Sequence, residues 1–301
     1  MKNILVIRDI QILNANALSS PYSVGFPPMT AWLGAVHALE RKLRSSEDYK
    51  NVRLPQTAVI CHEMNLQTHK HDGDYVHSII GTGNPLNKKG ERPPFIEEAR
   101  CHLRVTLVVE YQNLGFADRD EFATAVTHFL AHMKIASGDI LSFTPAQHRE
   151  IDDESSQKKL LRQLMPGYCL IERRDLMEQS MNEGLDCIDA LLEHLKVHHC
   201  SSVDDEGKVY WEASRKSKGW LVPIATGFHG LTEVGHASNQ RDPLTPHRFA
   251  ESIVTLGEFI MPYRMNNIEE MFWHYETNLN QHLYLCTQGD TITQTKERDD
   301  G

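Results

Sequence analysis

The sequence is short of basic charge and contains no long apolar run. It has 31 Lys and Arg residues against 41 Asp and Glu residues, so its formal net charge is −10 at pH 7. Proteins that bind any nucleic acid usually carry excess Lys and Arg, which displace counterions from phosphates. The balance argues against such a binder and leaves contacts through a local basic patch and oriented backbone amides. No apolar run approaches the ~18 residues of a membrane span, so we predict no membrane contact.

Cysteine is sparse, and none of the six cysteines lies in a C-x-x-C pair. In a chain of 301 residues this pattern favours buried thiols over a disulfide framework, and hence a cytoplasmic protein. One group of His and Cys residues could hold zinc, because His194 and His198 lie four residues apart and would share a helix face. A histidine-rich helix C-terminus explains the same residues through the helix dipole, so we predict no metal and no cofactor. The group is Cys187, His194, His198, His199 and Cys200.

Motifs that mark a catalyst are also missing. The sequence has no G-x-x-x-x-G-K-[ST] loop, no G-x-S-x-G and no H-E-x-x-H. His37 is the best candidate for a general base, because it follows a polar loop in a β-α-β order that some RNA-cleaving enzymes share. No second histidine or lysine is visibly placed to help it, and a packed histidine is the favoured interpretation. We therefore predict that the protein is not an enzyme.

Hydrophobic periodicity predicts the order β-α-β-excursion-β-α-β in the first half of the chain. In the strand expected at 97–111, Arg100, His102 and Arg104 alternate with apolar residues, which predicts one basic face. The order is that of a ferredoxin-like or RRM-like half, whose open sheet face is a common RNA platform but hosts many functions. The other strands are expected at 2–13, 57–68 and 140–143, the helices at 29–44 and 118–135, and the polar excursion at 69–96.

The second half of the chain has a less regular pattern. Its acidic residues cluster in a short polar stretch, which we interpret as a linker at 199–208. We predict helices at 155–165, 174–198 and, broken near Pro262, 247–276, with strands at 167–172 and 218–228.

Two polar segments could contact RNA. The loop 14–28 offers amide and hydroxyl side chains and leads into a helix N-terminus, which favours an anion. The excursion carries Lys70, Lys88, Lys89 and Arg92, with Tyr75 and Phe95 available for stacking. Composition alone is equally compatible with a plain polar loop at 14–28 and a solvated loop at 69–96. Arg248 is ambiguous in the same way.

An ordered set of short runs carries a more specific signal. In its content and order this set resembles the Csy-two family, the Cas-five-type (RAMP) subunit of the type I-F CRISPR surveillance complex. The resemblance extends from about residue 4 to 275. The runs include Asn14-Ala15-Asn16-Ala17, Ser19-Ser20-Pro21, Gly25-Phe26-Pro27, Gly34-Ala35-Val36-His37, Glu97-Glu98-Ala99-Arg100, Gly219-Trp220-Leu221-Val222-Pro223-Ile224 and Leu256-Gly257-Glu258.

The resemblance implies an α+β fold, namely a modified ferredoxin-like (RRM-like, RAMP) domain with a thumb and a helical C-terminal portion. We expect a core at 1–150 with its thumb at about 69–96, an α/β extension at 151–286 packed on that core, and a frayed tail at 287–301. The resemblance also implies a non-catalytic subunit that pairs with the large subunit of the complex, lies near a Cas-seven-type backbone subunit and meets target double-stranded DNA through the complex.

The implied ligand is the 5′ handle of the CRISPR RNA. Two alternatives stay open, a metal-independent RAMP-type ribonuclease that uses His37 and a protein-only scaffold for the large subunit. The residues expected to contact RNA are Asn14, Asn16, Ser19, Ser20, Lys88, Lys89, Arg92, Arg100 and Arg248.

Overall fold

The protein is seen in a computed structural model that describes residues 2–82, 85–94, 96–115, 118–240 and 242–289. The first half contains β1 (Lys2–Asn16), β2 (Leu18–Ser20), β3 (Ser23–Val24), α1 (Met29–Leu43), β4 (Thr57–Leu66), β5 (Thr68–His69), β6 (Ser78–Ile79), β7 (Gly81–Thr82), β8 (Ile96–Glu97), β9 (Arg100–Glu110), α2 (Arg119–Leu130), β10 (Lys134–Ile135), β11 (Gly138–Ser142) and β12 (Gln147–Ile151). The second half contains α3 (Glu154–Gln163), β13 (Tyr168–Glu172), α4 (Arg174–Asn182), α5 (Cys187–Leu195), β14 (His198–Val203), β15 (Val209–Ser214), β16 (Leu221–Gly230), β17 (Ala250–Ile260), β18 (His274–Asn278) and β19 (Leu283–Thr287). Short 3₁₀ turns lie at Glu47–Tyr49 (η1), Pro262–Arg264 (η3) and Ile268–Met271 (η4).

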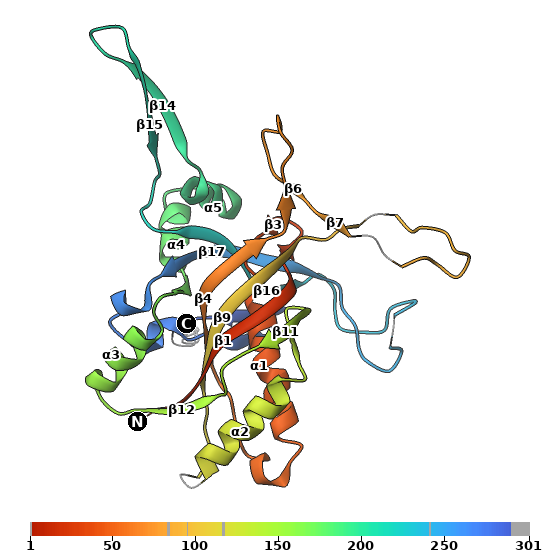
Figure 1. Ribbon diagram of the computed structural model, residues 1–301. Helices are drawn as coiled ribbons and strands as arrows, with labels where there is room; N and C mark the ends of the chain where they lie inside the picture. Colours follow the sequence, from red (N-terminus) through yellow and green to blue (C-terminus); the bar gives the residue numbers. More distant parts are fainter. Residues whose placement is uncertain (1, 83–84, 95, 116–117, 241, 290–301) are drawn as a thin grey trace, which may run out of the picture.

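One large antiparallel sheet organises the molecule (Figure 1). Its strands follow the order β10-β11-β1-β9-β4-β13-β17-β16-β19-β18, with β12 also paired to β1. The predicted α+β class is confirmed, and the first half has the predicted β-α-β-excursion-β-α-β order. β13 pairs with both β4 and β17, so the sheet continues across the boundary expected near residue 150. None of the helices in the described ranges is long and apolar enough to cross a membrane.

The two faces of the sheet are covered differently. On one face α1 buries Trp32, Val36 and Leu39 in a core that also contains Val59 of β4. On the other face Ala58 and Ile60 belong to a second core with apolar side chains of α3. This alternation follows from the two-residue period of a strand. Past Ile60 the second face becomes polar, and it lies open towards the end of β4.

The C-terminal third differs from the prediction. The long helical segments expected at 247–276 are wrong, because this stretch forms β17, two 3₁₀ turns and the start of β18. β17 lies between β13 and β16 and is buried over Leu256–Phe259. Because four consecutive residues are buried there, the stretch shows no two-residue alternation, and periodicity does not separate it from a buried helix. The prediction of a helical C-terminal portion therefore holds only for the segment that contains α3, α4 and α5.

Among the described residues, two ribbons and one hairpin, each built of two strands, project from the body of the molecule (Figure 1). The expected excursion divides into a first ribbon, residues 68–79 with β5 and β6, and a second ribbon, residues 81–97 with β7 and β8. Both leave the sheet between the end of β4 and the start of β9. The third projection is the hairpin, residues 198–214 with β14 and β15. The linker predicted at 199–208 is therefore wrong, and most of the tail expected at 287–301 lies outside the described residues.

Candidate nucleic-acid interface

β9 presents a polar side and an apolar side, as its sequence predicted. Cys101, Leu103 and Val105 are buried in the core under α1, whereas Arg100, His102 and Arg104 are only partly buried. The polar side chains lie on the open part of the sheet next to β4 and β1, where Asn65 is the register partner of His102. The predicted alternation is confirmed, and it places these groups at the end of the sheet from which both ribbons leave.

The charge on this face is balanced rather than basic. Arg104 lies between two carboxylates, with its Nη2 2.6 Å from Glu63 Oε1 and its Nη1 3.1 Å from Asp9 Oδ1. The hydrogen bond to Glu63 raises the pKa of the Arg104 guanidinium, and the bond to Asp9 adds to this effect. Arg100 forms an ion pair with Glu98. The expected basic face is thus a polar face whose cations are already paired.

A shallow hollow of about 310 Å³ lies on this open face. His102 Nδ1 accepts a hydrogen bond from the backbone N–H of Asn14 at 3.1 Å, which places the ring proton of a neutral His102 on Nε2. Imidazole and amide groups of this kind can hydrogen-bond base edges or ribose. The hollow is lined by Gln11, Ile12, Leu13, Glu63, Asn65, His102, Leu103, Arg104 and Leu141.

The loop predicted at 14–28 is more ordered than its composition suggested. β1 continues to Asn16, and Asn14 has a positive φ of 57°. Arg100 is the register partner of Asn16, and the Nη1 of Arg100 donates to the Asn14 carbonyl at 3.4 Å. The structure therefore brings together three of the residues predicted to contact RNA.

The hydroxyl and amide groups of this loop are largely used within it. Asn16 bonds both the N–H and the carbonyl of Leu18 through its side chain. Ser19 Oγ donates to the Phe26 carbonyl at 2.6 Å, and buried Ser20 shares a 2.8 Å hydrogen bond with Ser23. These contacts fix the β2–β3 turn, so Ser19 and Ser20 have a structural role that composition did not reveal.

An aromatic ladder reaches from the core to the surface beside this loop. Buried Trp32 stacks on Phe26, which meets Phe259 edge-on at 5.4 Å. Phe259 then contacts Trp220 at 5.0 Å, and Trp220 meets Tyr168 at the same distance. Trp220 is 53% exposed. The sequence singled out Trp220 only within a family run, and no local pattern showed that four other aromatic rings would hold it.

The second ribbon carries the cations predicted to contact RNA. Asn87 Oδ1 accepts from the backbone N–H groups of Lys89 and Glu91 at 2.9 and 3.0 Å, which shapes the turn at the tip. Lys88, Lys89 and Arg92 are exposed, and within the described part of the chain none of them forms an ion pair. Phe95, expected to stack, lies outside the described residues.

The first ribbon has a different chemistry. Its one lysine, Lys70, is accompanied by Asp72 and Asp74, and its histidines contact one another, with His69 Nε2 3.3 Å from His71 Nδ1. Tyr75 is 97% exposed at its tip. The two ribbons therefore divide the expected thumb into a mixed-charge part and a cationic part.

The contacts of Arg248 are made with residues other than those predicted to bind RNA. Its Nε donates to the Thr232 carbonyl at 2.8 Å, and its Nη2 lies 2.8 Å from His282 Nδ1. These bonds tie the β16–β17 connection to the β18–β19 turn. The structure does not bring Arg248 into contact with the other predicted RNA residues in the described ranges.

His37 lies on an exposed turn of α1, beside a hollow of about 320 Å³. The Tyr275 ring is 6.5 Å from the His37 ring, and burial raises the pKa of Tyr275, which keeps its hydroxyl protonated. Among the described residues that line the hollow, no other histidine and no lysine is present. Glu40 also lines the hollow, but its carboxylate already accepts hydrogen bonds from the Leu54 N–H at 2.7 Å and from Arg53.

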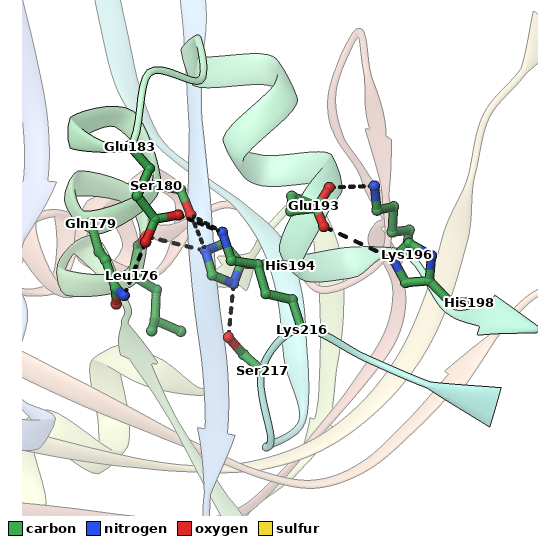
Figure 2. A network of polar contacts seen from close by, with 10 residues as sticks. All are labelled: Leu176, Gln179, Ser180, Glu183, Glu193, His194, Lys196, His198, Lys216 and Ser217. Atoms are coloured by element: carbon green, nitrogen blue, oxygen red, sulfur yellow. Dashed lines mark hydrogen bonds and ion pairs between the residues drawn. The ribbon is translucent and has the colours of Figure 1, made fainter. Parts of the chain in front are cut away.

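The residues considered for zinc are separated. The helix α5 ends at Leu195, so His198 lies in β14 and the expected shared helix face is wrong. Buried His194 donates from Nε2 to the Leu176 carbonyl at 3.1 Å, and its Nδ1 accepts from the Ser217 hydroxyl at 2.9 Å (Figure 2). In the ranges that the structure covers, no group of three or more His, Cys, Asp or Glu side chains is arranged to hold a metal.

The cysteines follow the prediction only in part. Burial raises the pKa of Cys61 and of Cys101 to about 12, so these thiols stay protonated and unreactive at neutral pH. Cys169 and Cys286 are buried as well, whereas Cys187 and Cys200 are exposed.

The hairpin root is held by the His194 network (Figure 2). Lys216 Nζ reaches Ser180 Oγ and Glu183 Oε2, each at 3.0 Å, and links the strand leaving the hairpin to α4. Beyond this root the hairpin is exposed on both faces, with Val203 67% and Trp211 71% accessible. Its tip carries Asp204, Asp205 and Glu206.

Comparison with known proteins shows one family along nearly the whole chain. The family model described as CRISPR-associated protein (Cas_Csy2) matches residues 5–286. The CRISPR-associated protein Csy2 of Pseudomonas aeruginosa (strain UCBPP-PA14) is 31% identical over 310 residues, which span 93% of this chain and 94% of that protein.

Proposed function

Because the chain belongs to the Csy2 family of CRISPR-associated proteins, we propose that it holds the 5′ handle of the CRISPR RNA as a non-catalytic subunit of the type I-F complex. The observation that carries this proposal is the segregation of charge. In a chain of net charge −10, the second ribbon presents Lys88, Lys89 and Arg92 without ion pairs in the described ranges. The ribbon that carries these cations leaves the sheet between the end of β4 and the start of β9, where the polar open face lies (Figure 1).

The proposed RNA path uses three kinds of contact. Phosphates follow the second ribbon, because Lys and Arg side chains position a nucleic-acid backbone without reading its sequence. Polar groups around Asn14, His102 and Asn65 meet base edges or ribose at the open face. Trp220 offers a stacking surface for one base, which is worth about 1–3 kcal/mol. Sequence recognition of invading DNA is then left to guide–target base pairing.

Protein partners are assigned to another part of the molecule. The hairpin exposes Val203, Tyr210 and Trp211 on an isolated two-stranded unit, which has little stability of its own in water. Aromatic residues are enriched in the cores of protein interfaces. We assign this hairpin to the large subunit, with the Cas-seven-type backbone subunit adjacent and target double-stranded DNA met through the assembled cytoplasmic complex.

The strand order supports a fold of the RAMP class. The order β11-β1-β9-β4, with α1 and α2 on one face, is the arrangement expected of a ferredoxin-like unit. In this proposal residues 1–150 form the RAMP core, both ribbons together form its thumb, and residues 151–286 extend the same sheet.

The test replaces Lys88, Lys89 and Arg92 together with Ala. We expect less guide RNA in the purified complex, and a slope of log K against log salt for single-stranded repeat RNA that is about 2 units shallower, since each lost contact contributes ~0.7. The matched control replaces Lys42, Lys50 and Lys134, which are exposed cations outside the ribbons. Unchanged RNA retention and an unchanged salt slope in the ribbon variant would refute the assignment.

A further inference from the structure

A second cationic surface lies on α3 and the adjacent strands. Arg162 and Lys159 line a surface hollow of about 530 Å³ along α3. Lys159 also lines a second hollow of about 410 Å³, whose other side is formed by Arg149 of β12. Arg8 of β1 reaches the same place, with its Nη2 3.3 Å from Gln163 Oε1, and Gln163 lines both hollows. We name Arg8, Arg149, Lys159 and Arg162 the α3 cradle.

The cations of the α3 cradle lack carboxylate partners among the described residues. Arg8 bonds the neutral amide of Gln163, and Arg149 bonds the Gln147 amide and the His148 carbonyl. Lys159 and Arg162 form no ion pair in the described ranges. A chain with ten more acidic than basic residues would readily compensate such charges, as it does around Arg104.

Three of the acidic groups nearby already have partners. Glu154 pairs with Lys158, and Glu150 pairs with Arg119 at 3.3 Å. Asp153 caps α3 by accepting from the Ser156 N–H at 2.7 Å, and these bonds to Ser156 lower the pKa of the Asp153 carboxyl. Within the described ranges, none of these three carboxylates forms an ion pair with a cradle cation.

The cradle is also held in place. α3 buries Leu160 and Leu161 in the core on the second face of the sheet, and β1 and β12 are paired in register from Lys2–Ile151 to Val6–Gln147. The backbone that carries these cations is therefore preorganised, and the planar guanidinium of arginine matches a phosphate through two parallel hydrogen bonds.

We propose that the α3 cradle binds the phosphodiester backbone of a nucleic-acid strand, at a site separate from the second ribbon. α3 covers the Ala58 end of β4, whereas the ribbons leave beyond Leu66, so the two surfaces lie roughly 25 Å apart at ~3.3 Å per strand residue. Two such surfaces contact different parts of a nucleic acid. The source of the phosphates is either double-stranded DNA or an RNA strand other than the guide, and the test distinguishes them.

The test reverses two exposed charges, Lys159→Glu and Arg162→Glu, in the complex assembled with its guide RNA. The probes are a labelled DNA duplex and a labelled single-stranded RNA, neither of which can pair with the guide. Binding is measured between about 50 and 200 mM salt. We expect the slope of log K against log salt for the bound probe to become shallower by about 1.8 for duplex DNA or 1.4 for RNA. We expect the affinity at the lower salt concentration to fall at least tenfold, on the order of 1.4 kcal/mol.

The matched control is Lys50→Glu with Lys134→Glu, which changes net charge equally at exposed lysines that have carboxylate partners. A loss with duplex DNA alone assigns the phosphates to DNA, and a loss with RNA alone assigns them to RNA; both support the proposal. An unchanged slope with both probes, or an equal loss in the control, overturns it. So does loss of a protein subunit with unchanged slopes, which would assign the surface to a protein partner. Guide-RNA retention stays unchanged in the cradle variant, so failure here is separable from failure of the proposed function.

Discussion

The second ribbon and the hairpin are both two-stranded projections, yet their surfaces are opposite in chemistry. The second ribbon carries three cations and few large apolar side chains, whereas the hairpin has three carboxylates at its tip and exposes Val203 and Trp211. The difference shows that the net charge of the whole chain does not predict the charge of each surface. A charge of −10 is compatible with RNA binding when cations without ion pairs gather on one projection, as Lys88, Lys89 and Arg92 do beside Glu91.

The roots of the two projections differ as well. The hairpin is tied to α4 and α5 by the His194 network, with Lys216 bonded to Ser180 and Glu183 (Figure 2). The second ribbon starts from the short pairing of β7 with β8, and its turn is shaped by Asn87. An anchored apolar arm suits a protein surface of fixed shape, and a lightly paired cationic arm can follow a nucleic-acid backbone.

The largest effect is expected at the hairpin surface. Changing Val203 and Trp211 together to Asp places two carboxylates in an apolar interface core. The loss of binding free energy should be about 2 kcal/mol or more for each buried anchor. We expect the large subunit to be lost from co-purification, while binding of repeat RNA by this chain is retained. The control is Leu244→Asp, an exposed leucine outside the hairpin. Co-purification of the large subunit at the normal ratio would contradict the assignment.

The hairpin root should contribute to stability in a way that the ribbon tip does not. His194→Ala leaves the Leu176 carbonyl and the Ser217 hydroxyl without their buried partner. This should lower the free energy of unfolding by about 2 kcal/mol. Urea denaturation measures this, with exposed His128→Ala on α2 as the control. A ribbon variant such as Lys88→Ala should leave the unfolding free energy unchanged. Equal losses in all three would remove the distinction between the two roots.

Stacking at the end of the aromatic ladder sharpens the assignment of RNA to the ribbon side. Trp220→Ala should weaken binding of repeat RNA about tenfold, since one stacked base is worth about 1–3 kcal/mol. Fluorescence anisotropy measures the change, and Phe228→Ala, an exposed aromatic residue outside the ladder, should have no effect. Equal affinities of parent and Trp220→Ala would place the RNA path elsewhere.

The smallest effect is expected at His37. Replacement with Ala should leave both RNA affinity and any background cleavage of repeat RNA unchanged, because no other histidine and no lysine lines its hollow in the described ranges. Gel analysis of incubated repeat RNA checks this. Cleavage by the parent that disappears in the variant would favour the ribonuclease alternative and reassign the site to α1.

The sequence predicted the first half of the fold well because its strands are rich in β-branched residues and its helices keep an amphipathic period. In β9 the alternation of Arg100, His102 and Arg104 with buried residues identified the strand and its polar side. β17 was missed because Leu256–Phe259 is buried without alternation, and β14 because all of its residues are exposed. In both cases periodicity carries no information about the element.

The polar side of β9 was predictable, but its neighbours and its charge balance were not. Asn14 and Arg100 are brought together by the pairing of β1 with β9, and pairing of Arg104 with Asp9 and Glu63 joins three separate strand positions. Such a balance depends on register and on a bulge after Cys61, neither of which the sequence shows. The aromatic ladder likewise joins five rings from distant segments.

The antiparallel pairing at the foot of each projection has a consequence for how this chain can change over time. The hairpin and both ribbons begin and end on paired strands, so added or removed residues at their tips leave the sheet register untouched. Doubling the length of such a loop costs only about 0.6 kcal/mol. The reach of each arm can therefore be adjusted to a new binding partner by small insertions, without redesign of the domain that carries it.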